Sequence, residues 1–261
     1  MAFTVHAVMP GVWHIVDCMG VCMTLLEGEN AAMLVDTGYG IEDVADFMRH
    51  MTDLPLTVFL THNHHDHAMG ARCFPETYML EADMADWGIF TNDEMRRRVL
   101  TQAIGKNLTV DEKTFLAGEI PLPKVMKPGV IDLGGLTAEI IEAPGHTPGS
   151  AVVYVPERKL LLSGDDWNPC TWLFFPQALG LREYRSNMRG IQQLPFEKVL
   201  CPHREALYDR WMFDDFFNAL TDGNLRAAEP VNIAPYEQID TCQATLPHDQ
   251  VFVFDWAKSG L

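Results

Sequence analysis

The sequence predicts an α/β fold in which two β-sheets are covered by helices. Short apolar runs typical of strands alternate with helical patterns in both halves of the chain. Hydrophobic residues make up 48% of the 261 residues and charged residues 21%, which is ordinary globular composition. A chain of this length can bury roughly three quarters of its unfolded surface. Because no linker or low-complexity tract interrupts it, we expect residues 1–261 to form a single domain.

The N-terminal half begins with strands. Apolar runs bounded by turn residues predict strands at 11–16, 22–26 and 32–35. Apolar residues then recur at helical spacing, which predicts an amphipathic helix over 41–51. A short buried strand follows at 56–60. Two helices, near 83–90 and 93–105, and a proline-punctuated loop over 121–128 complete this half.

The C-terminal half repeats the alternation. Residues 129–164 are rich in strands and include a hairpin whose turn is Pro156-Glu157-Arg158. A helix near 181–193, a strand at 198–200, a helix over 204–222 and a strand at 251–254 follow.

Charge excludes several function classes. Lys and Arg number 19 and Asp and Glu 36, giving a net charge of −17, which disfavours nucleic acid and anionic membranes as partners. The basic run Arg96-Arg97-Arg98 is interpreted as a solvated helix face. No apolar run is long enough to span a membrane, and we find no signal peptide, so we expect a cytoplasmic protein with six reduced cysteines.

Four of the ten histidines fall between positions 62 and 67, directly after a predicted strand. On an extended backbone His62 and His64 point the same way, whereas on a helix they would diverge. Asp66 and His67 lie where the chain turns towards a helix. Imidazoles with one carboxylate suit zinc, and also iron or manganese. His65 is interpreted as a bystander or as a group that supports the ligands without binding metal itself.

Other polar residues occupy the same kind of position, each directly after an apolar strand. They are Asp36, His146, Asp165 and His203. In α/β folds such strand ends are where sites assemble. We therefore expect these residues to converge with the histidine cluster.

These motifs, in order, resemble those of the metallo-β-lactamase superfamily over residues 34–203. They are Asp36-Thr37-Gly38, Thr61-His62-Asn63-His64-His65-Asp66-His67, Gly145-His146-Thr147-Pro148-Gly149, Gly164-Asp165 and His203. The resemblance implies a four-layer αββα sandwich of two mixed β-sheets with a dinuclear metal site. It implies that His62, His64 and His146 hold one metal, that Asp66, His67 and His203 hold the second, and that Asp165 bridges both. Asp36 would orient the ligands.

This implied ligand set predicts a hydrolase. Two divalent cations, zinc first with iron or manganese as alternatives, would supply a bridging hydroxide at neutral pH. We expect this hydroxide to attack an ester, lactone or thioester of a small molecule with an acyl or aromatic part. Asp66 is the predicted catalytic residue, because its carboxylate would orient the nucleophile or move its proton.

Other functions remain open on the same residues. Persulfide dioxygenases share this fold and these motifs but use one iron held by two histidines and an aspartate. A small-molecule phosphodiesterase is a third option, which the negative charge disfavours. The aromatic segment 167–175 lines an apolar pocket, packs in the core or forms the interface of a homodimer.

Overall fold

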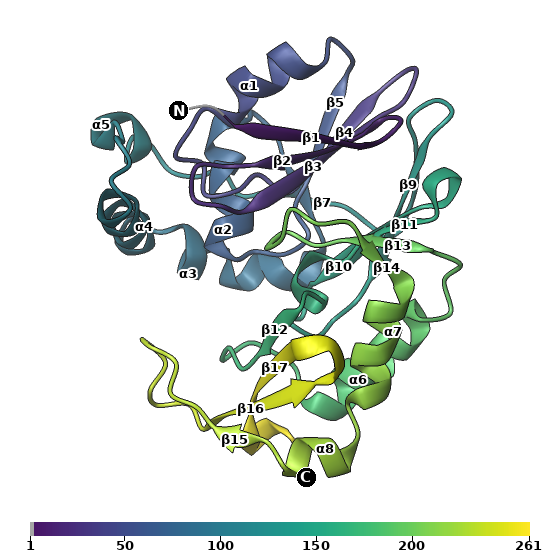
Figure 1. Cartoon of the computed structure of the whole chain (residues 1–261). Coiled ribbons are helices and arrows are strands. Elements are labelled where there is room, and N and C mark those ends of the chain that lie inside the picture. The colour runs from purple at the N-terminus through teal and green to yellow at the C-terminus, as the bar shows by residue number, and fades with distance from the viewer. Residues whose placement is uncertain (1–2) are drawn as a thin grey trace.

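The computed structural model describes residues 3–261 and contains two large mixed β-sheets packed face to face (Figure 1). In the first sheet β1 to β4 are antiparallel and β4 to β7 parallel. Its strands, in chain order, are β1 (Thr4–Met9), β2 (Val12–Val16), β3 (Cys22–Glu27), β4 (Ala32–Val35), β5 (Leu56–Phe59), β6 (Tyr78–Met79) and β7 (Lys124–Val125).

The second sheet has the order β14-β13-β11-β10-β9-β8, and only its β11–β13 pair is parallel. Its strands are β8 (Gly129–Asp132), β9 (Thr137–Glu142), β10 (Ala151–Val155), β11 (Leu160–Leu162), β13 (Lys198–Leu200) and β14 (Tyr208–Asp209). The parallel pairs in both sheets bring several strand carboxyl ends to one edge of the sandwich.

Helices cover the outer faces of both sheets, which gives four layers (Figure 1). Against the first sheet lies α1 (Val44–Met51), and against the second lie α6 (Leu181–Ile191) and α7 (Arg210–Ala219). The remaining helices are α2 (His65–Ala68), α3 (Trp87–Thr91), α4 (Asp93–Gly105), α5 (Glu112–Phe115) and α8 (Asp222–Arg226). Short 3-10 turns occupy Met69–Cys73, Glu81–Asp86, Pro156–Arg158, Gly164–Asp166, Pro247–Asp249 and Trp256–Lys258.

The layers follow from strand alternation. In β4, Met33 and Val35 face the second sheet, whereas Leu34 faces α1. In β10, Val153 faces the first sheet and Val152 faces the helices. Both faces of these central strands are therefore buried, as the continuous apolar runs in the sequence indicate.

A third sheet, which the sequence analysis did not foresee, packs at the end of the molecule that carries the C-terminus (Figure 1). It joins β12 (Cys170–Leu173), β17 (Gln250–Asp255), β16 (Thr241–Leu246) and β15 (Glu229–Pro230) in that order. Its apolar residues extend the core beneath α6 and α7. The predicted strand at 251–254 lies within β17.

Two local predictions were wrong. The helix expected over 204–222 begins only at Arg210, because Tyr208 and Asp209 pair with β13 as a strand. Arg96 is not on a solvated face: it is 1% exposed and donates to the carbonyls of Phe115, Ala117 and Gly118, which close the end of α5. The remaining arginines of the run are exposed.

Two further features of the described residues concern membrane-spanning helices and cysteines. No helix within 3–261 is both long and apolar enough to cross a membrane. Within the described residues the six cysteines form no disulfide bond with one another.

Candidate metal centre

The seven predicted ligands come together on four loops, each of which follows a strand. His62, His64, Asp66 and His67 follow β5, and the last two lie in the first turn of α2. His146 follows β9, Asp165 lies in the turn after β11, and His203 follows β13. The placement at strand carboxyl ends is the one the sequence indicated.

Three imidazoles form the first donor set. The ring centroids of His62, His64 and His146 lie 4.6 to 4.9 Å from one another, and one nitrogen of each lies within 4.8 Å of the others. His64 Nδ1 and His146 Nε2 are 2.9 Å apart. Such a triangle of nitrogens leaves a fourth position open in a tetrahedral site.

Neighbouring groups orient these rings. His146 Nδ1 donates to the carbonyl of Trp172 at 2.7 Å, which directs its Nε2 into the triangle. His62 Nδ1 lies 3.1 Å from the hydroxyl of Thr61, so its Nε2 also faces inward. Both tautomers therefore leave an Nε2 lone pair for a metal.

The second donor set contains Asp66, His67 and His203. Oδ2 of Asp66 lies 3.7 Å from Nε2 of each histidine. Asp165 lies between the two sets: its Oδ2 is 3.5 Å from His146 Nε2 and 3.5 Å from His67 Nε2. His203 Nε2 is 3.1 Å from the same carboxylate. One carboxylate is thus shared by both sets.

The surroundings of the two donor sets shift the pKa values of their side chains in different directions. Burial, together with the neighbouring imidazoles, lowers the pKa of His62 well below its usual value, and burial does the same for His64. Burial also opposes protonation of His67, but Asp165, Asp66 and Asp36 outweigh it and raise its pKa. Burial alone would raise the pKa of Asp66, yet the adjacent histidines, His67 first, lower it to about 2. The first set is therefore neutral and the carboxylates ionised, as metal ligands must be.

The donor chemistry fits divalent cations. Nε2 of His62, Nε2 of His67 and Oδ1 of Asp165 are buried without a hydrogen-bond partner among the described residues. Buried polar atoms in folded proteins are nearly always paired, so three orphaned donors and acceptors at one point need an explanation. Five histidines and two carboxylates are also the ligands that zinc, iron and manganese accept.

Asp36 orients the second set, as the resemblance implied. Its carboxylate accepts from His67 Nδ1 at 2.9 Å and from the backbone N–H of Thr61 at 2.7 Å. The first contact directs His67 Nε2 towards Asp66 and Asp165. Asp36 also adopts φ +64°, a left-handed conformation that non-glycine residues seldom take, at the turn after β4.

Sequence reasoning missed Asp83, which ties together the two loops of the first set. Its buried carboxylate accepts from Gly149 N at 2.6 Å, Thr147 Oγ1 at 2.7 Å and Asn63 N at 3.1 Å. Thr147 and Gly149 follow His146 on one loop, whereas Asn63 lies between His62 and His64 on the other. A Cβ at Gly149 would lie 2.6 Å from Asp83 N, so the glycine is required. Burial raises the pKa of Asp83 to about 6, and the hydrogen bonds oppose that rise.

Gln177 is a second missed residue. Its amide lies 2.5 Å from Nε2 of His64, whose Nδ1 faces the first set. The atom of Gln177 at this distance is Nε2; with Nδ1 of His64 free for a metal, Nε2 of His64 carries the proton, and the amide of Gln177 must turn so that its oxygen accepts it. No motif in the sequence singles out a glutamine after the aromatic segment.

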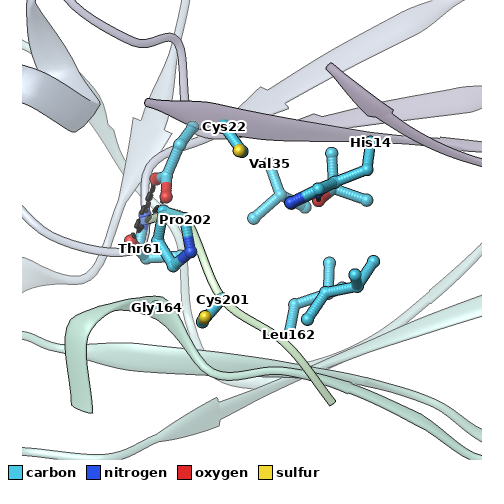
Figure 2. Close-up of a pocket in the computed structure, with 11 residues that line it drawn as sticks. His14, Cys22, Val35, Thr61, Leu162, Gly164, Cys201 and Pro202 are labelled. Atoms are coloured by element: carbon cyan, nitrogen blue, oxygen red, sulfur yellow. Dashed lines mark hydrogen bonds between the residues drawn. The ribbon is translucent and has the colours of Figure 1, made fainter. Parts of the chain in front are cut away.

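A small cavity lies behind the centre, between the two sheets (Figure 2). His14 and Cys22 enter it from the first sheet and Leu162 and Cys201 from the second, and its volume is about 10 Å³. His14 Nε2 donates to the carbonyl of Arg204 at 3.1 Å, and burial lowers its pKa, so the ring is neutral. This bond anchors the loop that carries His203 to the first sheet.

Two further sequence interpretations concern His65 and the aromatic segment 167–175. His65 lies outside both donor sets, and its Nδ1 is 3.9 Å from Oδ1 of Asp66, so both interpretations of His65 stay predictions. The aromatic segment 167–175 does two things: Trp167 and Phe174 are fully buried in the core, whereas Trp172 and Phe175 line a cavity beside the centre.

Comparisons with known proteins show what this chain is similar to. An acyl-coenzyme A thioesterase, MBLAC2 of Gallus gallus, is 26% identical over 202 residues, covering 69% of this chain and 70% of that protein. A metallo-beta-lactamase from Pontibacter korlensis superposes with a TM-score of 0.59 at 18% identity, covering 83% of this chain and 98% of that one. TTHA1623, solved in a di-iron-bound form, superposes with a TM-score of 0.54 at 20% identity, covering 76% and 94%. These structural likenesses show the fold.

The sequence profile of the metallo-beta-lactamase superfamily matches residues 16–203, a span that contains all seven predicted ligands together with Asp36 and Asp83. The chain belongs to the metallo-beta-lactamase superfamily.

Proposed function

We propose that this protein is a metal-dependent hydrolase of acyl thioesters and related esters or lactones, working with two divalent cations, zinc first. The observation that carries the proposal is the pair of donor sets that share Asp165. His62, His64 and His146 would hold one cation. Asp66, His67 and His203 would hold the other, with Asp165 between them.

Bound cations would supply a hydroxide nucleophile at neutral pH and polarise the substrate carbonyl. The protein's own side chains would position the nucleophile and transfer its proton. Asp66 is ionised, faces the open cavity and lies beside both histidines of its set. Its carboxylate can accept a proton from the nucleophile and pass it to the leaving sulfur or oxygen. The products are a carboxylic acid and a thiol or alcohol.

A thioester is the first choice of substrate because of the relative named above, an acyl-coenzyme A thioesterase that matches 69% of this chain. A small-molecule substrate also agrees with the cavity beside the centre, whose volume of about 520 Å³ lies within the range of ligand pockets.

The test is a substrate panel on protein reconstituted with zinc, manganese or iron. It comprises an acyl thioester, an aryl ester, a lactone and a phosphodiester, with oxygen uptake measured on a persulfide. We expect kcat/KM to be highest for the thioester and to need metal. Turnover of the phosphodiester alone, or oxygen uptake without carbonyl hydrolysis, would overturn the proposal.

A further inference from the structure

The cavity beside the candidate metal centre is lined by different kinds of residue at its inner and outer ends. At its inner end lie residues of both donor sets, including His64, Asp66 and His203. Outward from them its walls come from α3 and α4, from β12 and the residues after it, and from the segment between β15 and β16. Figure 1 shows this last segment reaching out on the same side of the molecule as α3 and α4.

Aromatic rings begin directly at the first donor set. The ring of Phe90, on α3, lies 4.5 Å from the imidazole of His64. The ring of Phe175 lies 4.7 Å from the same imidazole and 5.3 Å from that of His146. The two phenyl rings therefore lie directly against the imidazole of His64 in the candidate metal site.

Further apolar groups continue this surface outward. Tyr236 packs edge-on against Phe175 with ring centroids 5.3 Å apart, and Trp172 lies 6.2 Å from Phe175. Met95 and Val99 of α4 line the same cavity. We call the space lined by Phe90, Phe175, Trp172, Tyr236, Met95 and Val99 the acyl slot.

The acyl slot lacks the charges that would favour a polar acyl group. Among the residues that line the cavity, the carboxylates are those of Asp66 and Asp165, both in the donor sets. The cations are Arg98 and Arg204, whose side chains are exposed, and Arg98 is paired with Glu94 at 2.6 Å. The formal charges therefore lie at the centre and on exposed arginines, and the remaining lining is mainly apolar, with the uncharged polar side chains of Tyr39, Gln102 and Asn168.

We infer that the acyl slot binds an apolar acyl group and sets the substrate specificity, so that this protein cleaves esters or thioesters of hydrophobic acids in preference to acetate. The inference rests on the proposed function for the reaction itself. Tyr236 is the specificity-determining residue furthest along the chain, and it lies beyond residues 16–203, the span shared with the family. The C-terminal extension thereby adds one wall to a site that the family portion builds.

The test uses acetyl, butanoyl, octanoyl and phenylacetyl thioesters of one common thiol. With the metal-loaded wild type, we expect kcat/KM to rise about fourfold for each buried methylene until the slot is full. Tyr236→Ala and Phe90→Leu should each lower the ratio of kcat/KM for the octanoyl thioester to that for the acetyl thioester about tenfold. Ile89→Ala is the matched control, because Ile89 neighbours Phe90 on α3 but is 56% exposed and lies outside the cavity.

Binding of the free acids separates this inference from the proposed function. Calorimetry on the same preparations should show octanoate binding at least tenfold more tightly than acetate, with the difference reduced in Tyr236→Ala. That result supports the acyl slot even if no thioester is turned over, in which case only the proposed reaction fails. Rates and affinities independent of chain length, or unaffected by both slot variants, would overturn the inference.

Discussion

Replacing Asp165 with Ala is expected to remove catalysis and to reduce bound metal from two ions per chain to at most one. Its carboxylate is within 3.5 Å of one nitrogen from each donor set, and it also contacts His203. Asp165 also shares a grouping with His62 of the first set and His67 of the second, whose ligand atoms all lie within 4.8 Å of one another. Because bound cations contribute several kcal/mol of transition-state stabilisation, kcat/KM should fall by about a thousandfold or more.

The measurement is metal content and thioester hydrolysis on the same dialysed sample. Asp53→Ala is the matched control, since Asp53 is an exposed aspartate outside both donor sets, and it should keep wild-type metal and activity. An active Asp165→Ala protein that retains two ions would contradict the shared-carboxylate arrangement.

Replacing Asp83 with Ala is expected to destabilise the fold and to weaken metal binding by the three-histidine set. The change leaves Gly149 N–H, Thr147 O–H and Asn63 N–H without their buried acceptor. At about 1–3 kcal/mol for each unsatisfied donor, the free energy of unfolding should fall by at least about 3 kcal/mol. Metal affinity of the first set should fall about 10- to 100-fold, because Asp83 holds both loops that carry its histidines.

Urea unfolding of the metal-free proteins and competition with a metal chelator measure the two effects separately. Asp83→Asn keeps one acceptor oxygen and should fall between wild type and Asp83→Ala in both. Glu81→Ala, at an exposed position two residues away, should match the wild type. Unchanged metal affinity in Asp83→Ala would show that the loops hold their geometry without it.

The convergence of the candidate ligands could be predicted because these residues carry local patterns. His62 and His64 follow an apolar strand at a spacing of two, and His146, Asp165 and His203 follow strands of the same kind. Strand ends in α/β folds converge, so the sequence was enough to place all of them at one edge. The two large sheets and most helices followed from the same alternation of apolar runs.

The residues that were missed act through tertiary contacts alone. Asp83 lies in a short polar 3-10 turn 20 residues after Asn63 and 64 before Thr147, with no motif around it. The one indirect sign was Gly149, whose lack of a side chain makes room for Asp83. Tyr236 belongs to a loop, and its place against Phe175 depends on the third sheet, whose strands come from distant segments.

Predictions from local sequence pattern were also wrong where tertiary contacts, and not composition, decide the structure. Arg96 sits in a run of three arginines, yet α4 directs it inward, where the carbonyls at the end of α5 compensate for the loss of water. The stretch from Arg204 to Tyr208 has helical composition, but His14 binds the carbonyl of Arg204, and β13 pairs with the residues that follow.

Metal stoichiometry tests the central claim most directly. Elemental analysis of protein purified without chelators or added metal, repeated after reconstitution with zinc, gives the number and identity of ions per chain. Two donor sets sharing Asp165 predict about two divalent ions per chain, with zinc restoring hydrolysis. About one iron per chain that zinc cannot replace, or no more than one ion after reconstitution, would contradict the two-metal account.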